Sequence, residues 1–465
     1  MLSLDDNPYI SPNAILSEPI SFSKNAKYVL FSDSTLPGWA LINEIGSQIL
    51  KKCNGNTSIA NIVKELFGKY PDIPSYQIIA DVLRMFQELE EKGILFASRK
   101  KYEASCKPIE PEPFSGLYCE ITSRCNLKCK HCYVNGKPTG NEELPLDIIL
   151  NILEQCKQLG GNLVMLSGGE PLLYPSFISI CEEALKLGND VIILTNGTLI
   201  DSHIISLLEN WPKLRIQISL NGITQETHDI LCGIGTFKLT MRGLKKCLDA
   251  GLANKLIMSF TVLSGNFHDV EPYIKWCVQN NIKKVSLKRL SRQGRARKHW
   301  EKLTLSDKPE EISSFFYEKL DKLLAPYKDD IHIDGIPSEK TFSLEEMVSL
   351  EYPCPLGSIL RIDPSGSVYP CQLLDGNEFV IGSIFKDKLE DILKGEKLLR
   401  IQDLGKSRID KISKCSKCAF KHFCAGGCMA MALWEYGSIY YPEPICEIRR
   451  KILTKKLYDF TGNQV

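Results

Sequence analysis

Strand-like and helix-like segments alternate six times between Leu117 and Leu290, and this alternation constrains the fold more than any other feature. Short apolar runs predict the strands, and amphipathic stretches such as Leu146–Leu159 and Phe177–Leu187 predict the helices between them. Such alternation is typical of βα units that build a parallel sheet. We therefore expect an α/β fold with six units in an open, partial barrel. The predicted strands are Leu117–Thr122, Leu163–Ser167, Val191–Thr195, Leu214–Leu220, Leu256–Val262 and Val285–Leu290.

Three cysteines follow the first predicted strand, in the segment ITSRCNLKCKHCYVNG. Cys125, Cys129 and Cys132 have the spacing C-x3-C-x2-C, so their thiolates can hold three corners of a cubane iron–sulfur cluster. The fourth iron then lacks a protein ligand and can bind and reduce another molecule. A zinc site is the alternative interpretation, because His131 is within reach as a fourth ligand.

Polar motifs also follow the next three predicted strands. Ligands of parallel α/β sheets bind at the carboxyl ends of the strands, so we expect these motifs and the cysteine loop to share one face. The motifs are GGEP with Gly168, Gly169 and Glu170, LTNGT with Asn196 and Gly197, and ISLNG with Ser219 and Asn221.

In the cysteine loop and GGEP, the chain resembles the radical S-adenosylmethionine (SAM) superfamily, whose fold is a partial (β/α)6 TIM-like barrel. The resemblance implies that Cys125, Cys129 and Cys132 hold a 4Fe–4S cluster. It also implies that SAM is cleaved reductively to a 5′-deoxyadenosyl radical, which takes a hydrogen atom from the substrate. The implied SAM contacts are Tyr133, Gly168, Gly169, Glu170, Pro171, Asn196 and Ser219.

One position departs from the pattern of related peptide-modifying enzymes, which commonly carry an acidic residue where this chain has Asn221. A carboxylate role in proton removal is therefore in doubt at that position. Glu120, on the first predicted strand, is the candidate catalytic acid that remains. A structural or cofactor-orienting carboxylate is the alternative for Glu120.

A second group of cysteines lies in the C-terminal region, where C-x2-C spacing alone is compatible with a zinc ribbon. The whole pattern, however, resembles the SPASM extension of radical SAM enzymes and implies two auxiliary 4Fe–4S clusters, three clusters in all. One cluster would be fully ligated, by Cys415, Cys418, Cys424 and Cys446. The other would be held by Cys354, Cys371 and Cys428, with one iron open to a substrate thiolate.

The N-terminal region resembles the small PqqD-like winged-helix domain that binds leader peptides by adding a strand to a sheet edge. A strand at Ala26–Phe31 precedes helical patterns at Leu41–Cys53, Thr57–Phe67 and Gln77–Lys92. A generic helical cap over the barrel is the alternative. We expect four segments: the leader-recognition domain 1–106, the barrel 112–325, a connecting region 326–350 and the SPASM domain 351–460.

The net charge of +1 offers no reason to expect nucleic acid or an anionic membrane as a partner. The N-terminus lacks a basic start and an apolar segment, so no signal peptide is predicted and a cytoplasmic location is expected. A secreted disulfide framework is then a poor explanation for 18 cysteines. The isolated ones are predicted to be small buried apolar residues: Cys53, Cys156, Cys181, Cys247 and Cys277.

This domain order resembles the sactipeptide thioether synthases, which implies an enzyme that modifies a ribosomally made precursor peptide. The expected product is a cysteine thioether, and the expected electron source is an external reductant such as flavodoxin or ferredoxin. Carbon–carbon or carbon–oxygen cross-linking is an alternative. So is a sulfatase-type formylglycine maturase, although that enzyme needs no fused leader-binding domain.

Overall fold

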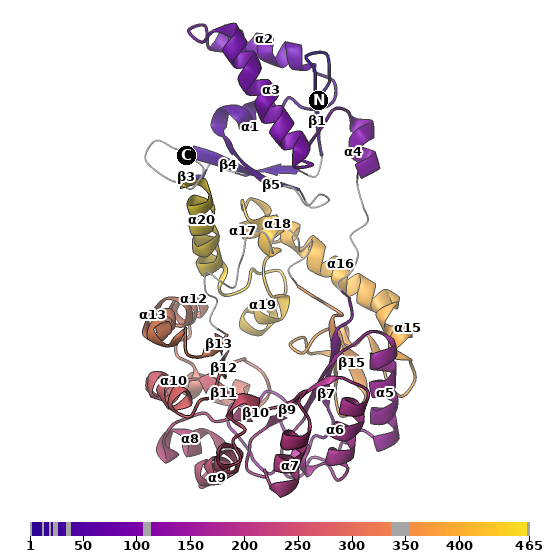
Figure 1. Cartoon of the computed structure of the whole chain (residues 1–465), viewed down its shortest axis with the longest axis vertical. Helices are drawn as coiled ribbons and strands as arrows, with labels where there is room; N and C mark the ends of the chain where they lie inside the picture. The colour runs from indigo at the N-terminus through magenta and orange to yellow at the C-terminus, as the bar shows by residue number, and fades with distance from the viewer. Residues whose placement is uncertain are drawn as a thin grey trace.

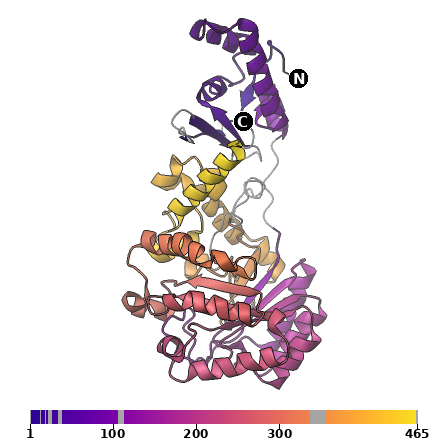
Figure 2. The same ribbon diagram turned by 60° about the vertical axis from the view of Figure 1, so that its left-hand side comes forward.

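A computed structural model describes residues 2–11, 14–17, 20–21, 27–33, 39–105, 113–335 and 354–462. Residues 107–111, between the expected leader-recognition domain and barrel, and residues 336–350 of the expected connecting region lie outside these ranges. Along the long axis, the N-terminal domain lies at one end, the barrel at the other, and the cysteine-rich region between them (Figures 1 and 2).

The N-terminal domain packs helices on a small antiparallel sheet in which β4 lies between β2 and β3 on one edge and β5 on the other. Its apolar core is separate from that of the barrel and includes Phe31, Leu50 and Phe86. The elements are β1 (Tyr9–Ile10), β2 (Ala14–Leu16), β3 (Ile20–Ser21), β4 (Lys27–Asp33), β5 (Trp39–Asn43), α1 (Glu44–Leu50), α2 (Ile59–Lys69), α3 (Ser75–Glu91), β6 (Leu95–Phe96) and α4 (Arg99–Ser105).

The predicted helix Leu41–Cys53 is wrong at its start, because residues up to Asn43 belong to strand β5. Buried Ala40 and Ile42 alternate with half-buried Trp39 and Leu41, which is the period of a strand. Asn43 then ends the strand and caps α1, since its side chain accepts a 2.7 Å hydrogen bond from the main-chain N–H of Gly46. The polar cap thus marks the boundary between the two elements.

Six consecutive parallel strands form the partial barrel, as the alternation predicted. A seventh strand, β13 (His332–Asp334), pairs in parallel with β12 at one edge. The six strands are β7 (Gly116–Glu120), β8 (Leu163–Ser167), β9 (Asp190–Thr195), β10 (Leu214–Ser219), β11 (Leu256–Val262) and β12 (Lys284–Arg289).

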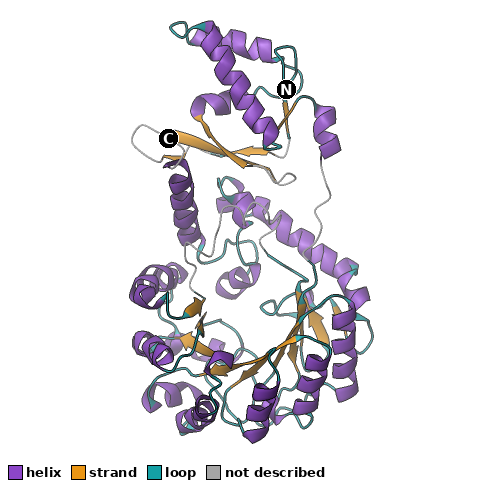
Figure 3. Cartoon of the chain, in the orientation of Figure 1, coloured by secondary structure: helices purple, strands orange, loops and turns teal. Residues whose placement is uncertain are grey.

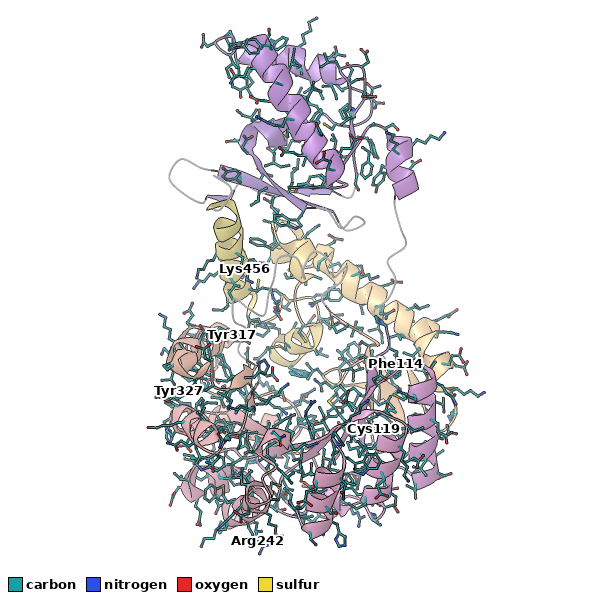
Figure 4. The ribbon with its side chains drawn as sticks, viewed as in Figure 1. Phe114, Cys119, Arg242, Tyr317, Tyr327 and Lys456 are labelled. Carbon is teal, nitrogen blue, oxygen red and sulfur yellow. The ribbon has the colours of Figure 1, made fainter. Side chains whose placement is uncertain are left out.

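Helices cover the outer face of this sheet (Figure 3). Figure 4 marks Cys119 and Phe114 on the side of the barrel that carries β7 and α5; Cys119 is fully buried. The predicted apolar cysteines Cys156, Cys181, Cys247 and Cys277 lie in the same core, and Cys53 lies in the N-terminal core. The helices are α5 (Leu146–Gln158), α6 (Phe177–Lys186), α7 (Ser202–Asn210), α8 (Gln225–Cys232), α9 (Thr236–Asp249), α10 (Val270–Gln279), α11 (Trp300–Leu303), α12 (Pro309–Ser314) and α13 (Leu320–Leu324).

The C-terminal region continues the barrel sheet, because β14 pairs in parallel with β7 and carries the antiparallel strands β15 and β16. Residues of both regions, among them Leu117 and Leu360, belong to one core. No helix among the described residues is long and apolar enough to cross a membrane. The elements are β14 (Ile359–Ile362), β15 (Ser367–Tyr369), β16 (Gly382–Ser383), α15 (Leu389–Leu393), α16 (Glu396–Lys411), α17 (Ser413–Ser416), α18 (Lys421–Cys424), α19 (Met429–Tyr436) and α20 (Cys446–Gly462).

Candidate active site

The loop after β7 presents Cys125, Cys129 and Cys132 at the carboxyl end of the parallel strands. The main-chain N–H of Cys125 donates to the carbonyl of Lys137 at 3.1 Å, which folds the far arm of the loop back along the near arm. Cys125 is buried, whereas Cys129 and Cys132 are half-buried. Burial raises the pKa of Cys125 to about 12 and also raises that of Cys132. Binding to iron would stabilise these thiols as thiolates.

Arg295 holds this loop from the opposite edge of the barrel, and the sequence analysis missed it. Its Nε donates to the carbonyl of Cys129 at 2.8 Å, and its Nη1 donates to that of Gly136 at 2.7 Å. Its main-chain N–H donates to the carbonyl of Cys132 at 2.9 Å. Gly294 precedes it with a φ of +50°, and a Cβ there would lie 2.4 Å from the carbonyl of Tyr133. The sequence did contain a signal for Arg295. Gly294 and Arg295 follow the sixth strand, at the end of the sheet that also carries the cysteine loop.

Gly168 and Gly169 bring the GGEP turn against the start of the cysteine loop. A Cβ on Gly168 would lie 2.4 Å from the carbonyl oxygen of Thr122, and one on Gly169 would lie 2.2 Å from that of Arg124. Gly168 also has a φ of +140°, a conformation that disfavours other residues. The two predicted motifs therefore pack backbone to backbone.

Glu170 is fully buried, and its carboxylate joins the ends of β8 and β9. Oε1 accepts from the hydroxyl of Thr195 at 2.7 Å and from the N–H of Leu172 at 3.2 Å, and Oε2 accepts from the N–H of Asn196 at 2.8 Å. Burial raises the pKa of Glu170 to about 7, against the opposing effect of these hydrogen bonds. Pro171, also buried, opens the short 3-10 helix that follows.

Asn196 reaches the cysteine loop from the end of β9. Its amide nitrogen donates to Oδ1 of Asn126 at 2.9 Å, and Asn126 in turn donates to the hydroxyl of Thr198 at 2.8 Å. Ser219 ends β10, where it is in register with Ser259 of β11. The structure thus places the GGEP, Asn196 and Ser219 motifs at one end of the sheet with the cysteine loop. Their contacts with SAM stay a prediction.

Asn221 also contacts the cysteine loop, through His131. Its side-chain amide donates to Nε2 of His131 at 3.2 Å and contacts Sγ of Cys232 at 3.7 Å, while its Oδ1 accepts from the N–H of Thr261 at 2.8 Å. Burial lowers the pKa of His131 to about 4, so its ring is neutral and Nε2 can accept. The amide of Asn221 therefore donates to His131 and accepts from Thr261 at the same time. An ionised carboxylate could accept from Thr261 but has no proton to donate to His131.

Tyr133 and Glu120 lie on the β7 side of the site. The hydroxyl of Tyr133 is 2.5 Å from that of Tyr118, which is 3.0 Å from the hydroxyl of Ser167. Glu120 is 4% exposed, and its Oε1 has no hydrogen-bond partner among the described residues. Burial raises the pKa of Glu120 to about 7, although the positive charge of Arg361 opposes the shift. An unsatisfied, proton-accepting carboxylate of this kind is typical of catalytic positions, and its role stays a prediction.

Some of the C-terminal cysteines lie close enough to influence one another's pKa. Burial raises the pKa of Cys354, and the neighbouring thiols of Cys428 and Cys371 raise it further. Burial also raises the pKa of Cys415 to about 11, with added effects of Cys446 and Cys418. Burial raises the pKa of Cys424 to about 12, and Cys415 adds a small effect in the same direction. Ligation of clusters by these thiols stays a prediction.

Thiol groups of these kinds fit iron–sulfur clusters, whose irons take cysteine thiolates as ligands. Within the described ranges, no three His, Cys, Asp or Glu side chains converge closely enough to hold a single metal ion. That finding concerns single-ion sites, because the four irons of a cubane hold their thiolates farther apart. When bound, SAM and the first cluster would supply a 5′-deoxyadenosyl radical.

Three family models match the chain in separate segments. The model of the radical SAM superfamily matches residues 119–277, and that of coenzyme PQQ synthesis protein D (PqqD) matches residues 28–95. The model of the iron–sulfur cluster-binding SPASM domain matches residues 354–419. The chain is an enzyme of the radical SAM superfamily, with PqqD and SPASM domains. It requires SAM and a 4Fe–4S cluster, and its SPASM domain binds auxiliary iron–sulfur clusters.

Two curated relatives are similar to the chain at low identity. The antilisterial bacteriocin subtilosin biosynthesis protein AlbA of Bacillus subtilis is 26% identical over 414 residues, which cover 87% of each chain. The mycofactocin maturase MftC of Mycobacterium tuberculosis is 25% identical over 333 residues, covering 71% of this chain and 82% of its own.

Solved structures agree on the fold. Streptococcus suis SuiB bound to its precursor peptide SuiA superposes with a TM-score of 0.58 at 17% identity, covering 94% of this chain and 99% of that one. The native protein anSMEcpe with bound AdoMet superposes with a TM-score of 0.56 at 19% identity, covering 75% and 98%.

Proposed function

We propose that the protein is a maturase that binds a ribosomally made precursor peptide through its leader and installs a cysteine thioether in it. The observation that carries this proposal is the fusion of a PqqD domain with a radical SAM barrel and a SPASM domain in one chain. A peptide substrate is supported by two similar proteins. AlbA is a bacteriocin biosynthesis protein, and SuiB has been solved in complex with a precursor peptide.

The outer edge of β5 is the proposed docking site of the leader. Among the described strands, β5 pairs only with β4, so its other edge has main-chain donors and acceptors available to an added strand. A peptide strand at this edge gains main-chain hydrogen bonds, while side-chain pockets add specificity. Leu41 lies on the half-buried face of this strand and would contact leader side chains.

The thioether is proposed from the three-cysteine group of Cys354, Cys371 and Cys428. If these three thiolates hold a cluster, one iron has no cysteine ligand from this group and can take the thiolate of a substrate cysteine. In forming the sulfur–carbon bond, the carbon would lose a hydrogen atom to the 5′-deoxyadenosyl radical, and the thiol would lose a proton to solvent and an electron to an auxiliary cluster. The peptide therefore loses two hydrogens for each link.

The test uses peptides encoded by short open reading frames beside the gene. Each peptide is incubated with reconstituted enzyme, SAM and a reductant, and its cysteines are replaced by alanine one at a time. We expect the loss of two hydrogens in the mass spectrum to disappear with the linked cysteine. If the loss persists in a peptide without cysteine, the product is a carbon–carbon or carbon–oxygen cross-link instead.

The electron source proposed for this reaction is a small reductant protein such as flavodoxin or ferredoxin, since reductive cleavage of SAM needs an external electron. Free cysteine thiols such as these also persist in a reducing compartment, which favours the cytoplasm as the proposed location. A sulfatase-type formylglycine maturase is the second candidate, because a radical SAM barrel with a SPASM domain would also serve that reaction. The PqqD domain favours the first candidate.

A further inference from the structure

Arg408, in the last turn of α16, is a charged side chain that is fully buried. All of its hydrogen bonds go to main-chain carbonyls. Nη1 donates to Ile439 at 2.5 Å and to Tyr441 at 3.2 Å. Nη2 donates to Gly427 at 2.6 Å and to Ala425 at 3.4 Å. Its Nε has no hydrogen-bond partner in the described part of the chain.

The charge of this guanidinium has no counter-ion among the described carboxylates. The neighbouring Arg449 differs, because it pairs with buried Glu443, whose second oxygen accepts from the N–H of Cys428 at 3.0 Å. Carbonyl dipoles satisfy donors, but they do not neutralise a charge. A buried cation without an anionic partner is destabilising, for the same reason that breaking a buried ion pair is. An anion beside Arg408 would neutralise this buried charge.

Arg408 lies between the two groups of C-terminal cysteines. Its partners Ala425 and Gly427 belong to the link that joins Cys424 of one group to Cys428 of the other. One guanidinium thus holds the main chain of the link between the two groups.

The link itself is shaped to receive the guanidinium. Ala425, Gly426 and Gly427 have consecutive positive φ values of 44°, 74° and 69°. A Cβ on Gly426 would lie 3.1 Å from Nη2 of Arg408, and a Cβ on Gly427 would lie 2.0 Å from the carboxyl carbon of Glu443. Left-handed geometry is unfavourable at a non-glycine residue such as Ala425, so a compensating interaction is expected.

We propose that Arg408 is the shared counter-ion of the two auxiliary clusters, a positioning residue that stabilises their reduced forms. The inference rests on the proposed function only in that each cysteine group holds a cluster. Three or four thiolates give each such cluster a net negative charge, and reduction adds one more. A nearby buried cation stabilises the more negative form, so it raises the reduction potential. The unpartnered Nε gives one further donor for a thiolate or sulfide.

The test compares three variants of the full chain after anaerobic reconstitution. Arg408→Lys keeps the charge, Arg408→Gln keeps a donor but removes the charge, and Lys411→Met removes an exposed charge from the same helical turn. Iron and sulfide are counted, and the auxiliary potentials are measured by redox titration followed by electron paramagnetic resonance. In Arg408→Gln, we expect the auxiliary clusters to become at least tenfold harder to reduce, about 59 mV for a one-electron couple.

We expect Arg408→Lys and Lys411→Met to keep potentials close to those of the wild type, and the cluster at Cys125, Cys129 and Cys132 to be unchanged throughout. Loss of auxiliary iron in Arg408→Gln with retention in Arg408→Lys would also support the counter-ion. Unchanged potentials in Arg408→Gln, or equal loss of clusters in both Arg408 variants, would overturn the proposed counter-ion role. Arg408 would then serve only to hold the main-chain carbonyls that it contacts. Wild-type protein without auxiliary clusters would contradict the ligand assignment itself, and the counter-ion with it.

Discussion

The side chain of Arg295 donates a 2.8 Å hydrogen bond to the main-chain carbonyl of Cys129 across 166 residues of sequence. The same guanidinium holds Gly136 at the far arm of the cysteine loop. Its positive charge lowers the pKa of Cys132, against the larger effect of burial, and so favours the thiolate form. The sixth βα unit of the barrel thereby fixes the loop that follows the first strand.

Replacement of Arg295 by methionine should weaken the first cluster. Each hydrogen bond from a charged donor contributes about 1.5–3 kcal/mol, and the variant loses two of them together with the charge. We expect a loss of up to about four irons per chain, with the auxiliary clusters retained. The measurement is iron content with electron paramagnetic resonance spectra. Arg297→Met, at an exposed position two residues away, is the matched control and should keep its iron. Full iron content in Arg295→Met would exclude a role in holding the loop.

Joint replacement of Cys125, Cys129 and Cys132 by alanine should remove one of three clusters. Total iron should fall by about a third, from roughly twelve per chain, and cleavage of SAM should stop. Cys247→Ala is the control, because this buried thiol lies in the apolar core and should affect stability but not iron. Stoichiometric zinc in the wild type, or SAM cleavage by the triple variant, would refute the assignment.

Gly169→Ala should disturb the contact between GGEP and the cysteine loop. The new Cβ would lie 2.2 Å from the carbonyl oxygen of Arg124, and main-chain atoms cannot move aside as a flexible side chain can. Overpacking of this kind costs about 1–3 kcal/mol, which predicts roughly tenfold weaker SAM binding or more. Equilibrium dialysis with labelled SAM measures the effect. Gly265→Ala, where a Cβ meets nothing within 4 Å, should bind SAM normally.

Glu120 should make the folded protein less stable as the pH rises. Its pKa is raised from 4.5 to about 7 in the folded state, so the folded protein holds this proton more tightly than the unfolded chain does. The stabilisation is fully present below pH 4.5 and is lost as the pH rises through 7. Glu120→Gln should remove this dependence and gain up to roughly 2–3 kcal/mol relative to the wild type at pH 8.

Thermal unfolding of anaerobic samples at pH 5 and pH 8 measures this effect, and infrared spectra should show a protonated carboxyl band that Glu120→Gln lacks. Glu209→Gln, at an exposed position on α7, is the control. If the wild type and Glu120→Gln respond equally to pH, the carboxylate is ionised throughout the range and the predicted shift is wrong.

Deletion of residues 1–105 should leave SAM cleavage intact and slow modification of the full precursor. The N-terminal domain has its own core, so its removal leaves the barrel core complete. Loss of tethering lowers the local concentration of the peptide, which predicts at least about a tenfold slower reaction. A precursor without its leader is the control, since deletion should not change its rate. Equal rates on the full precursor would assign the domain a structural role.

The barrel could be predicted from the sequence because its signals are local. Apolar runs of period two and helices of period 3.6 locate elements within a residue or two, and Leu163–Ser167 and Leu256–Val262 agree with the structure at both ends. The alternation also places the polar motifs at one end of the sheet. The predicted helix Leu41–Cys53 was wrong at its start because strand β5 runs directly into helix α1. The continuous apolar stretch is compatible with both the two-residue period of a strand and the 3.6-residue period of a helix.

Contacts between segments that are distant in sequence could not be predicted from local periodicity. Nothing in the residues near Arg295 or Arg408 says which carbonyls their guanidinium groups will meet, because those carbonyls come from other elements. The pairing of β14 with β7 could not be predicted either, because it joins segments that are far apart in the chain. The hydroxyls of Ser115 and Ser358, 243 residues apart, are hydrogen-bonded beside it. Sequence by itself determined the order of the elements, the cysteine spacings and the end of the sheet that carries the site. Only the tertiary structure decided which charges stand beside which thiols, since burial and long-range packing, rather than local periodicity, set those distances.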